Sequence, residues 1–151
     1  MPRIVIADDS EYSRYALRKL LESHGCEVCG EAEDGLSAVE KSAILKPDLV
    51  ILDLNMPILN GLDAGHAIHA ANPGIPLLLF TLKDIGPTLL ELARQAGFRG
   101  ALAKGEGIFA LSEAIEVLLK GETFFLSASE SRLPAAAQSD STVRPDKSRR
   151  N

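Results

Sequence analysis

Residues 49–61 decide the fold, and they read Leu-Val-Ile-Leu-Asp-Leu-Asn-Met-Pro-Ile-Leu-Asn-Gly. The first four side chains are all apolar, which is the pattern of a central parallel strand covered on both faces. Asp53 follows this strand directly, and a short helical pattern starts at Gly61. In open α/β sheets, sites form at the carboxyl ends of the strands. This stretch therefore predicts a buried strand with a candidate functional residue at its end.

Short apolar strands alternate with helical patterns on both sides of this stretch. Ser10 is a predicted N-cap, because its hydroxyl can accept a backbone N–H that the first helix leaves unpaired. Helices are predicted over residues 11–23, 36–43, 61–70, 87–96 and 108–119. Strands are predicted over residues 4–7, 27–31, 49–52, 76–81 and 100–104. Five such units favour an α/β fold with a doubly wound five-stranded parallel sheet and helices on both faces.

The composition is that of one domain with a core of its own, since 46% of the 151 residues are hydrophobic. A net charge of −5 argues against a general nucleic-acid binder, which would carry a basic excess. Apolar runs such as residues 77–80 are far shorter than the roughly 20 residues of a membrane-spanning helix. Asp8 and Asp9 precede any apolar region of a signal peptide. We therefore expect a soluble, cytoplasmic protein without a membrane segment.

The alternating pattern ends at Gly121, which divides the chain into a folded domain over residues 1–121 and a tail over residues 122–151. Residues 123–126 are expected to pack back on the domain. The Ser-, Ala- and Pro-rich part from about Glu130 has too little apolar content to bury, and we predict that it is largely disordered.

Cys26 and Cys29 have the C-x-x-C spacing of redox and zinc sites. A zinc site would need a second pair of ligands, and no histidine has the spacing for it: His24, His66 and His69. The segment that holds both cysteines is predicted as a strand, in which residues three apart point to opposite faces. We interpret the two thiols as ordinary reduced cysteines, and His66 and His69 as solvated residues of a helix.

Polar side chains stand at the ends of four predicted strands. The first strand ends in Asp8 and Asp9, the third in Asp53, the fourth in Thr81 and the fifth in Lys104. These ends meet at one edge of a parallel sheet. Three carboxylates that close would raise one another's pKa, so we expect a cation among them. An oxygen-only ligand set favours Mg²⁺ over zinc.

This set of residues suits phosphoryl transfer, in which the protein positions and neutralises a group with charge on three oxygens. Asp53 is the natural nucleophile and would form an acyl phosphate. The Lys104 ammonium can pair with one phosphoryl oxygen, and the Thr81 hydroxyl can donate a hydrogen bond to another.

The sequence resembles a bacterial two-component response-regulator receiver domain from residue 3 to about residue 121. The resemblance rests on four motifs: Ile-Ala-Asp-Asp-Ser at 6–10, Leu-Asp-Leu-Asn-Met-Pro at 52–57 with Asn-Gly at 60–61, Phe-Thr at 80–81 and Ala-Lys-Gly at 103–105. Lys-Gly in the last motif, and Gly-Glu after the last helix, are similar to receivers of the NarL/FixJ type.

The resemblance implies a flavodoxin-like fold, and a phosphoacceptor rather than a turnover enzyme. Asp53 would take a phosphoryl group from a histidine kinase or a histidine phosphotransfer protein. Asp9, Asp53 and the backbone carbonyl of Asn55 would bind Mg²⁺, with Asp8 helping through water. Thr81 and Lys104 match the switch hydroxyl and the phosphate-binding lysine of the family.

The resemblance also bears on output. NarL/FixJ-type receivers usually carry a helix-turn-helix domain of roughly 60 residues, near the lower limit for a stable domain. Only 30 residues follow Gly121. We therefore predict a single-domain receiver that signals through a protein partner without binding DNA directly. The fourth and fifth helices are the family's usual dimer face, which leaves a homodimer through them open.

Two positions depart from the family pattern. Ala101 stands three residues before Lys104, where the family usually has a Tyr or Phe that rotates inward as the switch hydroxyl moves toward the phosphate. Leu82 follows Thr81, where the family tends to have a small residue. We predict that Leu82 crowds the phosphate pocket.

Two alternatives use the same residues differently. A phosphatase of the haloacid-dehalogenase type also uses a strand-end aspartate with Mg²⁺, but it needs a second acid where this chain has Asn55. A degenerate receiver would bind a partner without phosphate. Ala101 and the missing output domain keep this alternative open, whereas the intact set Asp8, Asp9, Asp53, Thr81 and Lys104 speaks against it.

Overall fold

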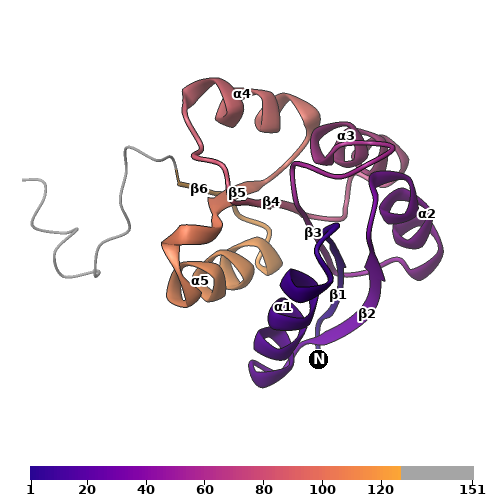
Figure 1. Cartoon of the computed structure of the whole chain (residues 1–151), viewed down its shortest axis with the longest axis vertical. Coiled ribbons are helices and arrows are strands. Elements are labelled where there is room, and N and C mark those ends of the chain that lie inside the picture. Colours follow the sequence, from indigo (N-terminus) through magenta and orange to yellow (C-terminus); the bar gives the residue numbers. More distant parts are fainter. Residues whose placement is uncertain (127–151) are drawn as a thin grey trace, which may run out of the picture.

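The computed structural model describes residues 1–126, and these form one parallel sheet with the strand order β2-β1-β3-β4-β5-β6 (Figure 1). The strands are β1 (Arg3–Ala7), β2 (Glu27–Ala32), β3 (Leu49–Leu52), β4 (Leu77–Thr81), β5 (Gly100–Ala103) and β6 (Phe124–Phe125). The helices are α1 (Glu11–Ser23), α2 (Gly35–Leu45), α3 (Gly61–Ala71), α4 (Pro87–Ala96) and α5 (Ile108–Leu119), and a 3₁₀ turn at Lys104–Glu106 precedes α5. The predicted doubly wound α/β fold is confirmed.

Helices cover both faces of the sheet, with α1 and α5 on one side and α2, α3 and α4 on the other (Figure 1). Strand β3 lies inside both layers, and each of its four side chains is at most 1% exposed. Leu49 and Ile51 belong to the core under α1 and α5, whereas Val50 and Leu52 belong to the opposite core. Full burial contributes about 1.5–3 kcal/mol for each such side chain, so β3 anchors the sheet as its sequence predicts.

Side-chain caps start the first three helices where the sequence offers Ser, Asp or Asn. Ser10 Oγ accepts the Ser13 N–H at 3.2 Å, which confirms the predicted cap of α1. Asp34 and Asn60 cap α2 and α3 in the same way. Each cap satisfies a backbone donor that the first helical turn leaves open. Two of these caps stand next to the loops that carry the strand-end aspartates.

A sixth strand, β6, extends the predicted five-stranded sheet. It pairs in parallel with β5 and lies beyond Gly121, where the sequence pattern predicts the end of the folded domain. The predicted packing of residues 123–126 against the domain is confirmed, since Leu126 is 7% exposed within the core under α1 and α5. The rest of the predicted tail, with the disorder expected from Glu130, lies outside the described residues.

The two cysteines lie on opposite faces of the sheet, as the strand pattern predicts. Cys26 is part of the core under α1 and α5, and Cys29 packs against the core on the other side. Both thiols are free. Burial raises the pKa of each thiol, which keeps it protonated and poorly nucleophilic.

The prediction of two solvated histidines on α3 is wrong for one of them. His66 is exposed, but His69 packs against Gly97 at the end of α4, and its Nδ1 is buried without a hydrogen-bond partner among residues 1–126. The spacing of the two histidines could not show this, because the contact depends on how closely α3 and α4 approach. Within the same range, no helix is long and apolar enough to cross a membrane.

Replacing Gly97 tests this contact. Gly97 has a φ of +103°, and an added Cβ would lie 2.4 Å from His69 Cγ. We expect Gly97→Ala to destabilise the fold by about 1–3 kcal/mol, from backbone strain together with overpacking. Urea unfolding measures this change. Gly105→Ala is the control, because nothing lies within 4 Å of its added Cβ; equal stability of the two variants would contradict the tight α3–α4 contact.

Candidate functional site

Asp8, Asp9 and Asp53 come together at the carboxyl edge of the sheet. β1 and β3 are neighbours, so the residues that follow them lie side by side. Each carboxylate offers an oxygen within 4.8 Å of the other two. Asp8 is buried, Asp53 is half-buried and Asp9 is exposed, so the cluster runs from the protein interior to the surface.

Backbone and side-chain hydrogen bonds fix the loop that carries Asp8. One Asp8 carboxylate oxygen accepts the Ser10 N–H at 2.9 Å. Arg14 Nη1 donates to the Asp8 carbonyl oxygen at 2.6 Å, and Arg14 Nε donates to Glu31 at 3.0 Å. Arg18 also donates to Glu31. The loop is therefore tied to both α1 and β2 before any ligand binds.

Lys104 reaches the cluster from the end of β5. Its Nζ lies 2.5 Å from Asp8 Oδ2 and 3.9 Å from Asp53 Oδ2. The Phe80 ring lies beneath the ammonium, with its centroid 5.8 Å away. The lysine thus bridges two of the three carboxylates, and its shorter contact is with Asp8 rather than with the predicted nucleophile.

The environment of Asp53 opposes its ionisation. Burial raises the pKa of Asp53 above its usual value, Lys104 lowers it, and the neighbouring Asp8 raises it again. The Leu54 N–H donates to Asp53 Oδ1 at 2.8 Å and lowers the pKa of Asp53, and the nearby Thr81 hydroxyl also lowers it. Thr81 itself is 1% exposed. A cation at the three carboxylates would therefore relieve an unfavourable charge.

The donor set fits magnesium. Three carboxylates face one lysine ammonium, which leaves an excess of negative charge, and hard oxygen ligands are those that Mg²⁺ takes in proteins. Asn55 lies two residues after Asp53 with an exposed side chain. The part that we predict for its backbone carbonyl stays a prediction.

Gly61 lets α3 begin directly against the loop after β3. An added Cβ at Gly61 would lie 2.0 Å from the Asp53 carbonyl oxygen, and the Gly61 N–H donates to the Leu54 carbonyl oxygen at 2.8 Å. No larger residue fits this approach. The Asn-Gly pair at 60–61 is thus explained by the packing that holds Asp53 in place.

The sequence did not single out Arg14 or Phe80 as residues of the site. Arg14 belongs to the same predicted helix as Arg18 and Glu22, and the sequence pattern therefore predicts a solvent-exposed side chain. Its contact with Asp8 depends on the fold. Phe80 is half-buried and belongs to an apolar strand, so its place beneath Lys104 has no signal in the sequence.

The two departures from the family pattern differ in their surroundings. Ala101 is fully buried, and it pairs in register with Phe125 of β6. Leu82 is 80% exposed, although it follows the buried Thr81. The predicted crowding by Leu82 would therefore act at the mouth of the site and not inside it.

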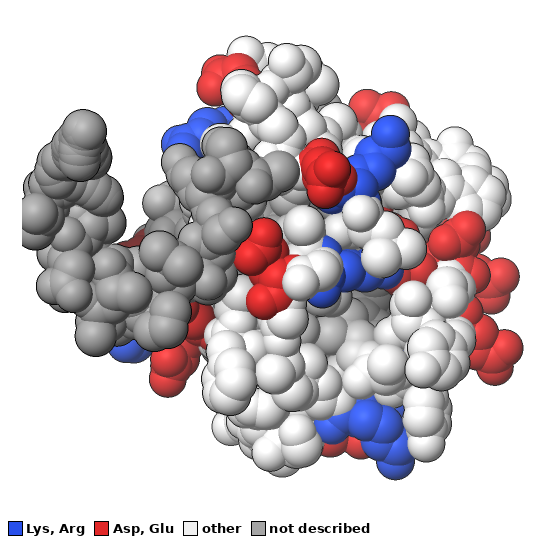
Figure 2. All heavy atoms as spheres, turned by 60° about the vertical axis from the view of Figure 1, so that its left-hand side comes forward, with Lys and Arg blue, Asp and Glu red and all other residues white. Residues whose placement is uncertain are grey.

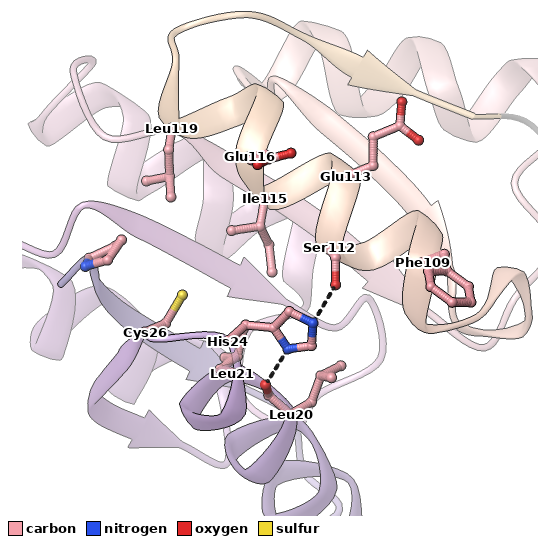
Figure 3. Close-up of a pocket in the computed structure, with 11 residues that line it drawn as sticks. Leu20, Leu21, His24, Cys26, Phe109, Ser112, Glu113, Ile115, Glu116 and Leu119 are labelled. Carbon is pink, nitrogen blue, oxygen red and sulfur yellow. Dashed lines mark hydrogen bonds between the residues drawn. The ribbon is translucent and has the colours of Figure 1, made fainter. Parts of the chain in front are cut away.

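A separate cavity of about 420 Å³ lies between α1 and α5 (Figure 3). His24 spans it, with Nδ1 at 3.0 Å from the Leu20 carbonyl oxygen and Nε2 at 3.3 Å from Ser112 Oγ. Pro2 and Cys26 also line this cavity, and they lie near the amino ends of β1 and β2. The cavity is therefore at the opposite end of the sheet from the three aspartates.

The profile of the response regulator receiver domain matches residues 4–116. The chain belongs to this family. Receiver domains act in two-component signal transduction, so the family expected from the sequence is confirmed. Receiver domains generally bind Mg²⁺ at an acidic pocket and interact with histidine kinases or phosphotransfer proteins.

Three similar proteins illustrate the range of the family. The transcriptional regulatory protein PdtaR of Mycobacterium tuberculosis is 40% identical over 117 residues, which are 76% of this chain and 55% of PdtaR. A LuxR-family two-component response regulator from Aurantimonas has a TM-score of 0.81 at 29% identity, covering 87% of this chain and 94% of that one. The receiver domain of the putative response regulator NarL from Mycobacterium tuberculosis has a TM-score of 0.75 at 30% identity, with 80% and 98% covered.

The receiver chain thus spans about half the length of PdtaR. Its surface offers no broad basic area in the view of Figure 2, where acidic and basic side chains of the described residues are interspersed. The predicted absence of direct DNA binding stays a prediction.

Asp53→Asn tests the electrostatics of this site. The raised pKa of Asp53 means that its ionisation costs stability as the pH rises through that pKa. We expect Asp53→Asn to raise Tm at pH 7 without divalent metal by about 2–5 °C, the effect of roughly 1 kcal/mol in a domain of this size. The gain should shrink as the pH falls toward the usual aspartate pKa near ~4. Calorimetry at several pH values measures it, and a lower Tm for the variant at pH 7 would refute this view of the site.

Proposed function

We propose that Asp53 of this receiver accepts a phosphoryl group from a histidine kinase or a histidine phosphotransfer protein. The observation that carries the proposal is the convergence of Asp8, Asp9, Asp53, Thr81 and Lys104 at one sheet edge. The five residues come from the ends of four strands, and each offers the chemistry that phosphoryl transfer requires.

In the transfer, an Asp53 carboxylate oxygen attacks the phosphorus of a phosphohistidine. The new O–P bond forms as the N–P bond breaks, and the electron pair stays on the imidazole nitrogen, which takes up a proton. Lys104 Nζ, at 3.9 Å from Asp53 Oδ2, is placed to pair with a phosphoryl oxygen. The Thr81 hydroxyl, which lies near the Asp53 carboxylate, would donate to another.

Asp8, Asp9, Asp53 and the Asn55 carbonyl would hold Mg²⁺. When bound, the ion neutralises negative charge on the phosphoryl oxygens. Asp8 would then have a second cationic neighbour, so the neutralisation of its charge would no longer depend on Lys104 alone. The loop contacts of Ser10 and Arg14 keep Asp8 in place during this exchange.

The phosphorylated form would act by binding a protein partner, since a receiver changes state without turning over a substrate of its own. A homodimer through α4 and α5 would have to accommodate β6, which lies at the β5 edge near both helices (Figure 1).

Intact mass after incubation with phosphoramidate and Mg²⁺ tests the proposal. We expect one added phosphoryl group in the wild type, and none in Asp53→Asn or in the presence of EDTA. An adduct that persists in Asp53→Asn would contradict the assignment of the nucleophile. No adduct in either the wild type or Leu82→Ala would favour the phosphate-independent binding module.

Leu82→Ala gives a second test. The Leu82 side chain of the wild type follows Thr81 and is 80% exposed. We expect it to lie over the mouth of the site and to shield the acyl phosphate from water and from small donors. The variant should react faster with phosphoramidate and lose phosphate faster, each by about threefold to tenfold, because ~1 kcal/mol in a barrier changes a rate about fivefold. Leu92→Ala, at an exposed leucine on α4, is the control. Equal rates for the wild type and Leu82→Ala would remove the idea.

A further inference from the structure

Residues 122–126, which we call the C-terminal strap, add β6 to the edge of β5. The Phe124 N–H donates to the Arg99 carbonyl oxygen at 2.9 Å, and the Leu126 N–H donates to the Ala101 carbonyl oxygen at 3.2 Å. Leu126 is buried in the core under α1 and α5. The Glu122 N–H also donates to the Val117 carbonyl oxygen at 3.1 Å, so backbone hydrogen bonds hold the strap at several points along its length.

Phe125 of the strap is the register partner of Ala101 of β5. The two residues pair in register on neighbouring parallel strands, so their side chains leave the sheet on the same face. Ala101 is buried in the core under α2, α3 and α4, and the partly buried Phe125 packs against that core. The guanidinium of Arg94 on α4 lies 4.1 Å from the centroid of the Phe125 ring. The strap therefore supplies an aromatic ring next to a position where β5 itself has only a methyl group.

Thr81 connects this packing to Asp53. Thr81 pairs with Ala103, and Leu79 pairs with Ala101, so Thr81 leaves the sheet on the face that Ala101 and Phe125 share. A phosphoryl group on Asp53 carries its accepting oxygens beyond the carboxylate, so the Thr81 hydroxyl has to move toward them to donate a hydrogen bond. Because Thr81 is 1% exposed, its movement leaves space inside the core.

A vacated space in a close-packed core is unfavourable, by about 24 cal/mol for each Å³ that stays empty. Ala101 and Ala103 are too small to fill it. Phe125 lies on the next strand, at the edge of the sheet, and the Arg94 guanidinium of α4 lies over its ring. It is a large side chain that can move inward without displacing a strand.

We propose that the C-terminal strap responds to phosphorylation of Asp53 and transmits this change out of the receiver domain. As Thr81 moves toward the phosphoryl group, the Phe125 ring moves from Arg94 toward Ala101, and the strap is held more tightly on β5. This inference rests on the proposed function.

Hydrogen exchange of the Phe124 and Leu126 amides in the full chain tests the proposal. The probe is Mg²⁺ with beryllofluoride, a phosphomimetic, compared with Mg²⁺ alone, and ¹⁹F NMR reports independently whether beryllofluoride is bound. We expect both amides to exchange about threefold or more slowly with beryllofluoride in the wild type, because opening of the strap becomes less favourable. Asp53→Asn should show neither the bound ¹⁹F signal nor the slower exchange.

Coupling is reciprocal, so strap variants should change beryllofluoride affinity. We expect Phe125→Ala to weaken beryllofluoride binding by the same factor by which beryllofluoride slows amide exchange in the wild type. Arg94→Gln removes the guanidinium that lies over the Phe125 ring, and we expect it to strengthen beryllofluoride binding. Phe109→Ala is the matched control, since that ring is 88% exposed on α5. If Phe125→Ala fails to fold, Arg94→Gln decides alone.

The outcomes separate the two proposals. Bound beryllofluoride with unchanged exchange of both amides would show that the strap is only structural, and it would overturn the inference while the phosphoacceptor proposal stands. No bound beryllofluoride in the wild type would overturn both. An unchanged affinity in Arg94→Gln would also count against a ring that moves.

Discussion

The contact of Lys104 with Asp8 and Asp53 is the interaction on which the rest of the site depends. Lys104 and Asp8 are 96 positions apart, and only the parallel order of the strands brings the 2.5 Å contact about. Asp8 is 4% exposed, and a buried carboxylate without a cationic partner would become neutral or destabilise the fold. Arg14 cannot replace the lysine, because it bonds the Asp8 carbonyl and not its carboxylate.

One lysine ammonium does not neutralise three carboxylates, and the remaining negative charge favours the binding of a cation. Burial and Asp8 raise the pKa of Asp53, so the folded domain holds a carboxylate in an unfavourable environment. Proteins break the rules of stability at functional sites and compensate elsewhere. Here the compensation comes from the enclosed β3 and from the capped helices α1 and α3 on either side of the cluster.

The sequence predicts the elements and the site residues because both depend on local patterns. Apolar runs define the strands, and the rule that sites lie at strand ends brings Asp8, Asp9, Asp53, Thr81 and Lys104 together. What it misses depends on contacts between distant elements. β6 is two residues long and has no alternation to recognise. The position of Lys104 nearer to Asp8 than to Asp53 is a matter of ångströms, which no pattern encodes.

The small residue at position 101 and the aromatic residue at position 125 are complementary, because they are register partners on neighbouring strands. A large ring at position 101 would compete for the face on which Phe125 packs, and an alanine there without β6 would leave the edge of β5 open. An open edge strand presents unpaired backbone groups to other chains. The strap covers that edge, yet β6 is too short to offer a long template itself. With an alanine at position 101, the face beside it is left to Phe125, and the segment that contains Phe125 forms the edge strand of the sheet.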